Sequence, residues 1–136
     1  MNMALYKKIQ ITETFLNNDK NTYFVFGDNL IKQGYGGAAI LRDHPRAIGF
    51  ITKKYPDNCD KSFYQPTEYS KVFFEELHKL KVNIANNPNK MFYVSQLGAG
   101  LANKFYIWEK LIHHNLVKEL QDFKNVIFCW EENLNK

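Results

Sequence analysis

Short apolar runs alternate along this chain with longer segments whose apolar residues have helical spacing. The runs at residues 23–26, 47–52, 91–95 and 125–130 are rich in aromatic or β-branched residues and are followed by glycine or polar residues, which is typical of buried strands. Residues 4–12 instead alternate apolar and charged side chains, which predicts a half-exposed strand at the edge of a sheet.

Two longer segments predict helices. Residues 67–86 begin with Thr67, a capping residue, and residues 105–122 follow the run at 91–95 and a glycine-containing stretch. Each segment has an apolar stripe that would face a core. The stripes consist of Phe73, Leu77, Leu80 and Ile84 in the first helix, and of Trp108, Ile112, Leu116 and Leu120 in the second.

The order of these elements predicts an α/β fold. Strands that alternate with helices favour a mainly parallel (mixed) sheet of five or six strands between helices. The remaining residues predict a turn at 13–21, a short helix at 38–41 and an irregular loop at 56–66. With 136 residues the chain has the length of one domain, so we expect a single three-layer α/β domain over residues 1–136.

Composition narrows the class of protein. A hydrophobic content of 45% is enough for a core, and the chain has no low-complexity block or internal repeat. The net charge of +4 and the pI near 9.0 come mostly from lysines scattered among asparagines and acidic residues. Because no tract of clustered lysine and arginine could follow a nucleic-acid backbone, we do not expect a nucleic-acid partner.

Metal and membrane roles have little support. Cys59 and Cys129 lack the spacing of a zinc site, and Cys129 lies in an apolar run where a free buried thiol is usual. His113 and His114 are neighbours on a predicted helix, where adjacent side chains point in different directions. The N-terminus has no signal-peptide core, and no apolar run is long enough to cross a bilayer. We therefore expect a cytoplasmic protein with no metal, cofactor or membrane partner.

The first candidate site follows the strand at 23–26, where polar residues and then three glycines lead into the short helix. Glycine lets the backbone approach a ligand closely, and the free N–H groups at a helix start favour negative charge. The pattern predicts phosphate binding, with a simple turn and close helix packing as the alternative. The candidate residues are Gly27, Asp28, Asn29, Gly34, Tyr35, Gly36, Gly37 and Ala38.

The second candidate site repeats the same order of strand, glycine loop and helix after residue 95. In open α/β sheets ligands bind outside the carboxyl ends of the strands, so both loops are expected to open onto one crevice. The alternative for these glycines is again purely structural. The candidate residues are Gln96, Leu97, Gly98, Ala99, Gly100, Leu101, Asn103, Lys104 and Phe105.

Several of these side chains have competing interpretations. Asp28 and Asn29 can reach a ligand hydroxyl or orient a water, or they can bond their own backbone. Lys104 can contact a phosphate or be an ordinary exposed lysine. Gln96 can bond a ligand or make a structural bond across the sheet, and Phe105 can stack on a base or pack in the core.

Both loops resemble those of the macro domain superfamily, the ADP-ribose-binding α/β module. The resemblance rests on Asp28-Asn29-Leu30 followed by Gly34-Tyr-Gly-Gly-Ala-Ala-Ile40, and on Ser95-Gln-Leu-Gly-Ala-Gly-Leu101 before a helix. Residues 23–130 are also similar to small uncharacterised phage and bacterial proteins with a Val-Phe-Gly-(Asp/Ser)-Asn-Leu signature. Residues 9–15 offer only Thr12, Glu13 and Thr14 where macro domains place an Asp that reads adenine, which leaves the base open.

The resemblance implies binding of ADP-ribose or a related nucleotide diphosphate across the two loops. It also implies a route to hydrolysis of an ADP-ribosyl linkage, with Asp28 as general base and Asn29 holding a ribose or a water. The partner would then be the free nucleotide or an ADP-ribosylated substrate. Two alternatives stay open: a non-catalytic phage or bacterial sponge that sequesters a nucleotide signal, and a protein or nucleic-acid interaction module whose loops are only structural.

Overall fold

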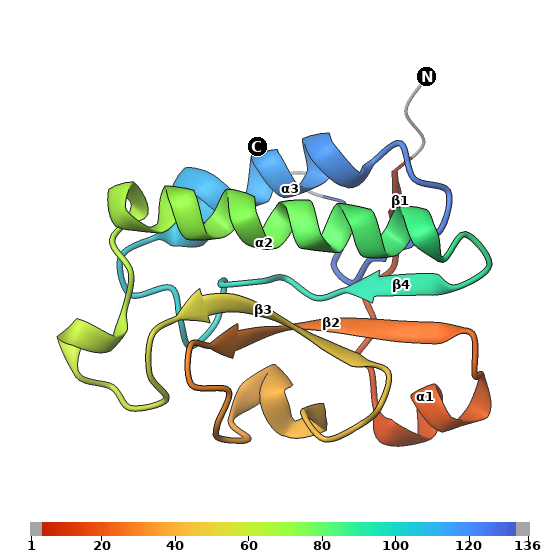
Figure 1. Ribbon diagram of the computed structural model, residues 1–136, viewed down its shortest axis with the longest axis horizontal. Helices are drawn as coiled ribbons and strands as arrows, with labels where there is room; N and C mark the ends of the chain where they lie inside the picture. The colour runs from red at the N-terminus through yellow and green to blue at the C-terminus, as the bar shows by residue number, and fades with distance from the viewer. Residues whose placement is uncertain (1–3, 133–136) are drawn as a thin grey trace.

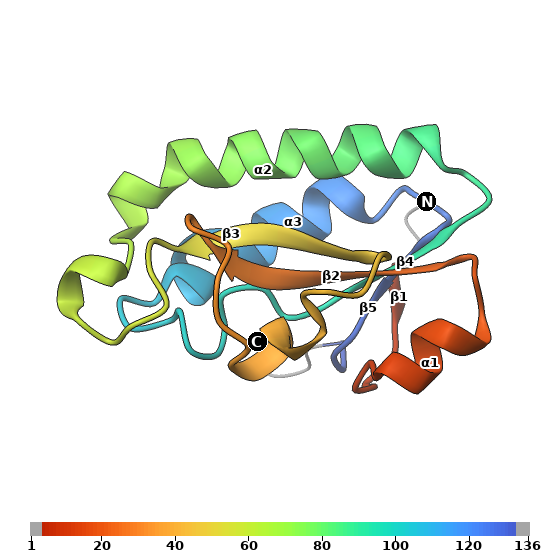
Figure 2. The same ribbon diagram turned by 60° about the horizontal axis from the view of Figure 1, so that its bottom comes forward.

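The computed structural model describes residues 4–132 and shows three layers, with a sheet between two sets of helices (Figures 1 and 2). The long helix and the last helix cover one face of the sheet, and the first helix and a short 3₁₀ helix cover the other. In chain order the elements are β1 (Leu5–Tyr6), α1 (Glu13–Asn18), β2 (Thr22–Asn29), 3₁₀ helix η1 (Gly37–Leu41), β3 (Ala47–Lys53), 3₁₀ helix η2 (Asp60–Ser62), α2 (Pro66–Asn86), β4 (Met91–Val94), π-helical turn η3 (Trp108–Ile112), α3 (His113–Leu120) and β5 (Val126–Phe128).

The sheet has five strands in the order β1-β5-β4-β2-β3, and each neighbouring pair is parallel. The expected α/β fold with a parallel sheet between helices is therefore confirmed, and among the described strands no antiparallel pair makes the sheet mixed. The first strand lies at an edge as expected, but only Leu5–Tyr6 of the expected residues 4–12 pair with β5.

Helix α1 corrects the turn expected at residues 13–21. Thr12 caps the helix, because its Oγ1 accepts a hydrogen bond of 3.1 Å from the Phe15 N–H, and Glu13 lies in the first turn, where negative charge is favourable. Leu16 is fully buried against the sheet. The polar residues 17–21 dominated the sequence pattern, but the capping residue and one buried leucine decide the local structure.

Three other boundaries differ from expectation. Strand β2 continues through Asn29, because β3 runs beside it and pairs with Asp28 and, after an irregularity, with Asn29. Helix α2 is capped at Gln65 rather than Thr67, since Pro66 occupies its first turn and the Gln65 N–H donates to Glu68 Oε1 at 3.3 Å. Strand β5 covers only Val126–Phe128 of the expected 125–130.

The last helical segment begins later than residue 105. Tyr106 has a φ of +66°, which no helix can contain, and the helical turns follow it as η3 and then α3. Asn103 Oδ1 accepts the Trp108 N–H at 3.0 Å and so satisfies a donor in the first turn. The helix start is thus separated from the glycines at 98 and 100 by a further stretch of loop.

The core is divided by the sheet into two clusters, as a three-layer fold requires. The larger one lies under α2, η3 and α3 and contains both expected stripes, all eight residues of which are buried. The smaller one joins α1 and η1 to β2 and includes Leu16, Phe24, Phe26 and Ala39. No helix within residues 4–132 is both long and apolar enough to cross a bilayer.

Candidate functional site

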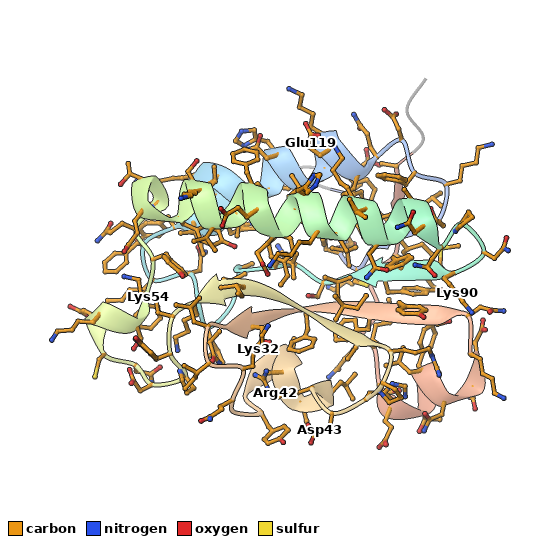
Figure 3. All side chains as sticks on the ribbon, in the orientation of Figure 1. Lys32, Arg42, Asp43, Lys54, Lys90 and Glu119 are labelled. Carbon is orange, nitrogen blue, oxygen red and sulfur yellow. The ribbon has the colours of Figure 1, made fainter. Side chains whose placement is uncertain are left out.

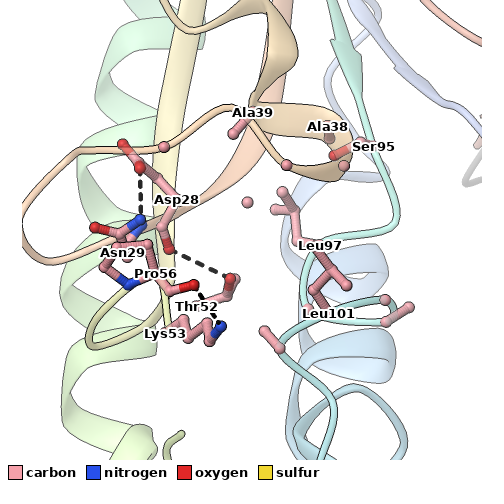
Figure 4. A pocket seen from close by; sticks show the side chains of 18 of the residues that line it. Asp28, Asn29, Ala38, Ala39, Thr52, Lys53, Pro56, Ser95, Leu97 and Leu101 are labelled. Atoms are coloured by element: carbon pink, nitrogen blue, oxygen red, sulfur yellow. Dashed lines mark hydrogen bonds between the residues drawn. The ribbon is translucent and has the colours of Figure 1, made fainter. Parts of the chain in front are cut away.

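A cavity of about 560 Å³ opens at the carboxyl ends of β2, β3 and β4. Two loops contribute to its walls: residues 30–36, which we call the first glycine loop, and residues 95–106, the second glycine loop (Figure 4). Of these, residues 33, 34, 36 and 95–102 line the cavity, together with parts of η1 and the ends of β2 and β3. The expectation that the two loops share one crevice is confirmed. The lining residues that the sequence predicted are Gly27, Asp28, Asn29, Gly34, Gly36, Gly37, Ala38, Gln96, Leu97, Gly98, Ala99, Gly100 and Leu101.

The position of the cavity follows from the topology. Strands β2 and β4 are neighbours, but the chain leaves β2 toward β3 on one side and leaves β4 toward β5 on the other. The two connections also pass on opposite faces, through η1 below the sheet and α3 above it (Figure 2). A point where connections diverge in this way leaves a crevice at the strand ends, which is where open α/β sheets bind ligands.

The Asn29 side chain closes the first glycine loop. Its Oδ1 accepts the N–H groups of Ile31 at 3.2 Å and Gln33 at 3.4 Å, and its Nδ2 donates to the Gln33 carbonyl at 2.8 Å. Of the two interpretations of this residue, the structure shows the one in which the side chain bonds its own backbone. Asn29 lines the cavity, but both of its polar atoms are engaged in the loop.

Arg42 holds the same loop from the other end. Its guanidinium donates through Nε to the Gly34 carbonyl at 2.8 Å, through Nη2 to the Gln33 carbonyl at 3.1 Å and through Nη1 to Asp28 Oδ1 at 2.6 Å. The Arg42 and Asp28 side chains are 11% and 4% exposed. Figure 3 shows Arg42 on the η1 side of the sheet, next to Asp43 in the chain. The nearly buried ion pair with Asp28 thus anchors Arg42, which holds the middle of the loop through the Gln33 and Gly34 carbonyls.

These contacts set the direction of the backbone N–H groups. The described peptide bonds are trans, so each N–H points away from the carbonyl that precedes it. Because the Gln33 and Gly34 carbonyls face Arg42, the N–H groups of Gly34 and Tyr35 point away from it. Within residues 4–132, the N–H groups of Gly34, Gly36, Gly37 and Ala38 meet no backbone acceptor.

Asp28 lies on the sheet and not in a mobile loop. Its Oδ1 also accepts the Asn29 N–H at 2.7 Å, and its carboxylate covers Gly49 of the neighbouring strand. A Cβ at residue 49 would come within 2.5 Å of Asp28 Oδ2, so only glycine fits beneath it. The residue proposed from sequence as a general base is therefore paired with Arg42 and packed against β3.

The second glycine loop is held by packing rather than by charge. Gly98 has a φ of +78°, and a Cβ there would lie 2.6 Å from Ile112 Cδ1 and 3.3 Å from Ile107 Cδ1. Its backbone nitrogen lies 3.8 Å from the position of a Cβ on Gly27, in strand β2. The N–H groups of Gly98, Gly100 and Leu101 have no backbone acceptor in the described part of the chain.

Leu101 brings the two loops into contact. A Cβ built on Gly36 or Gly37 would lie 3.5 Å or 3.3 Å from Leu101 Cδ1, although the leucine itself is 67% exposed. Gly37, which has a φ of +57°, is the glycine that this close approach needs, whereas a Cβ on Gly36 would make ordinary contact. The unpaired N–H groups of the two loops border one opening.

Four predicted site residues lie outside the cavity lining. The Tyr35 hydroxyl donates to Asp43 Oδ2 at 2.8 Å, which raises the pKa of Tyr35, and Asn103 caps the last helical segment. Lys104 Nζ pairs with Asp60 Oδ1 at 2.7 Å, and the Phe105 ring packs edge-on against Phe63. The latter two join the second glycine loop to the segment between β3 and α2.

The sequence missed eight lining residues because it considered only two strand ends. Strand β3 is the third parallel strand at this edge, so its last residues Thr52 and Lys53 necessarily reach the same crevice. Arg42 carries no local signal, since its role depends on the position of η1 below β2. The full set is Gln33, Ala39, Arg42, Thr52, Lys53, Pro56, Ser95 and Ala102.

Other chemistry is limited in the part of the chain that is described. No three His, Cys, Asp or Glu side chains there form a group that could hold a metal ion. Both cysteines are free, and burial raises the pKa of the Cys129 thiol to about 12. The cavity itself is lined by backbone, small apolar residues, the Arg42–Asp28 pair, hydroxyl and carboxamide side chains and one lysine.

A family model matches residues 6–103. This range runs from the end of β1 through β4 and includes the first glycine loop and the second glycine loop up to Asn103. The chain therefore belongs to this family, which is described as a family of unknown function (DUF7831). No curated protein and no solved structure matches the chain.

Proposed function

We propose that this member of the DUF7831 family binds ADP-ribose or a related nucleotide diphosphate in the cavity between its two glycine loops. The observation that carries the proposal is the set of unpaired backbone N–H groups that both loops present to one opening. Oxyanions are the natural partners of such groups, because hydrogen bonds to a charged acceptor are stronger than those to neutral ones. The resemblance of both loops to macro domains supports the same ligand class.

The two loops favour a diphosphate over a single phosphate. Donors on Gly36, Gly37 and Ala38 face one side of the opening, and donors on Gly98 and Gly100 border the other. Leu101 shows that these sides are in contact, so two linked phosphates can engage both at once. The cavity volume of about 560 Å³ lies within the range of small-molecule sites.

Ligand hydroxyls have partners deeper in the cavity. Thr52 and Ser95 line it, and the Thr52 hydroxyl makes only a long bond of 3.4 Å to the Asp28 carbonyl. Thr12, in the segment where macro domains read adenine, is committed to capping α1. The proposal therefore concerns the diphosphate and ribose part of the ligand and leaves the base unassigned.

The contacts of Asp28 favour binding without turnover. A general base needs a free carboxylate oxygen within reach of its proton donor, whereas Oδ1 of Asp28 already has two donors and Oδ2 lies over Gly49. This supports the second candidate function, a sponge that sequesters a nucleotide signal. Hydrolysis of an ADP-ribosyl linkage would require Asp28 to leave its pair with Arg42.

Calorimetric titration with ADP-ribose, NAD and adenosine tests the proposal. We expect ADP-ribose to bind and adenosine, which has no phosphate, to bind far more weakly. The double substitution Gly36→Val and Gly100→Val adds side chains where a Cβ has room and should weaken the binding of ADP-ribose without unfolding the protein. Absence of binding by ADP-ribose and NAD would refute the proposal.

A second measurement separates binding from catalysis. The protein is incubated with ADP-ribose and with an ADP-ribosylated peptide, and the compounds are recovered and separated by chromatography. Recovery of both intact supports the sponge. Release of ADP-ribose from the peptide that disappears in Asp28→Asn would support the hydrolase instead.

A further inference from the structure

Lys53 is a cation in the cavity wall that has no carboxylate partner. It is 8% exposed, and its ammonium makes one long hydrogen bond, of 3.5 Å, to the Pro56 carbonyl. Among the described residues the ion pairs of the molecule are made by other cations, namely Arg42, Lys54, Lys79, Lys81 and Lys104. A buried ammonium without an ion pair is costly, because burial removes its hydration.

The surroundings of Lys53 fix its position at the cavity. Its Nζ lies 4.7 Å from the centre of the Phe63 ring, which is itself buried, and the Lys53 carbonyl accepts the Leu30 N–H at 3.2 Å. In Figure 4 the side chain lies beside Thr52 and Pro56, across the cavity from Leu97 and Leu101. A ring face and one carbonyl hold the ammonium in place but do not neutralise it.

We propose that Lys53 selects for negative charge in this cavity by placing its ammonium group against a phosphate of the ligand. This inference rests on the proposed function and adds a charged contact to the backbone donors of the two loops. The lining residues of the second glycine loop, 95–102, include no charged side chain, and Arg42 is already occupied by Asp28 and two carbonyls. Lys53 is thus the cation in the described cavity wall that a ligand can engage.

Lys104 provides a matched control. Its Nζ also lies over the Phe63 ring, at 5.6 Å, but it is paired with Asp60 and does not line the cavity. Lys53→Met and Lys104→Met therefore each remove one positive charge next to the Phe63 ring. They differ in that the Lys53 side chain lines the cavity and the Lys104 side chain does not. Lys53→Arg keeps the charge at the cavity.

The test is calorimetric titration of the three variants and the natural protein with inorganic pyrophosphate and with ADP-ribose. We expect Lys53→Met to bind both probes about tenfold or more weakly, because the substitution removes a charge-assisted hydrogen bond to a phosphate. Lys104→Met should bind as the natural protein does, and Lys53→Arg should recover most of the loss. Thermal unfolding should show that Lys53→Met is no less stable, because methionine keeps the packing and removes a buried charge.

The possible outcomes separate this inference from the proposed function. If the natural protein binds both probes and Lys53→Met binds them equally well, the role of Lys53 is refuted and the proposed function stands. If the affinity for pyrophosphate depends on Lys53 but neither ADP-ribose nor NAD binds, the proposed function is refuted and the phosphate contact of Lys53 stands. If pyrophosphate, ADP-ribose and NAD all fail to bind, both proposals are refuted.

Discussion

The two glycine loops have the same order of elements in the sequence but are stabilised by different forces. The first glycine loop is held by polar contacts, in which Asn29 and Arg42 bind its carbonyls and N–H groups and Asp28 neutralises Arg42. The second is held by close packing of Gly98 against Ile107 and Ile112. Similar patterns of strand, glycine and helix thus do not imply a common mechanism of loop stabilisation.

The difference has a consequence for the cavity. Charged groups line it on the side of the first glycine loop and β3, whereas the lining residues of the second loop are uncharged. Substitutions of the polar groups that hold the first glycine loop should therefore act through unpaired buried charge. Substitutions in the second glycine loop should act through steric strain.

The largest effect is expected for Arg42→Met. The substitution leaves the Asp28 carboxylate buried without its partner and frees two loop carbonyls, and breaking a buried pair costs about 3 kcal/mol or more. Urea denaturation would measure the loss of unfolding free energy. The double variant Asp28→Asn with Arg42→Met should recover part of it, because the buried charge is gone. A loss below about 1 kcal/mol would show that the loop does not depend on this pair.

Gly98→Ala should be next in size. Its Cβ would overlap Ile112 Cδ1, and its φ of +78° is unfavourable for alanine, so we expect a loss of about 2 kcal/mol. Ile112→Val removes the methyl group that the new Cβ meets. In a double-mutant cycle by urea denaturation, Gly98→Ala should therefore cost less in the Ile112→Val background. An equal cost in both backgrounds would show that backbone conformation, and not packing, is limiting.

Lys53 should make stability rise with pH in the alkaline range. Burial lowers the pKa of Lys53 below its usual value, and the nearby Asp57 carboxylate opposes this shift only in part. The other cation next to Phe63 is Lys104, whose charge is paired with Asp60. Between the lowered pKa of the folded state and the ordinary pKa of the unfolded chain, the unfolded state binds more protons, so the unfolding free energy rises with pH. The measurement is the difference between the natural protein and Lys53→Met across this range, which should be flat if Lys53 is fully hydrated.

The smallest effects on stability are expected for Gly36→Ala and Gly100→Ala. A Cβ on Gly36 makes ordinary contact with Leu101, and a Cβ on Gly100 meets nothing within 4 Å, so each should change the unfolding free energy by less than about 0.5 kcal/mol. Thermal and urea unfolding check this. A large loss for either would show that the glycine serves the fold and not the opening.

The fold could be largely predicted from the sequence, because the spacing of apolar residues along the chain indicates which side chains are buried. The stripes of α2 and of the last helical segment and the apolar runs of the strands all reach the core. Helix α1 was missed since a six-residue helix has too few positions for a period, and its formation depends on one cap and on Leu16 meeting the sheet. The end of β2 was missed because pairing with β3 keeps polar residues in the strand.

The candidate site could be predicted in part. Glycines 34, 36, 37, 98 and 100 were identifiable because they follow strands, and the rule for parallel sheets brings strand ends together. The contacts of Arg42, and the positions of Lys104 and Phe105 outside the cavity, had no sequence signal, since each depends on which distant segment lies next to it.

The sequence by itself determined the α/β class, the two apolar stripes and the two glycine loops, because each is encoded by spacing or residue type within a short window. The tertiary structure alone decided that Asp28 pairs with Arg42, that Leu101 touches Gly36 and Gly37, and that Lys53 borders the cavity without an ion pair. These contacts join residues that are far apart in the chain, and only the order of strands in the sheet brings such residues to one edge.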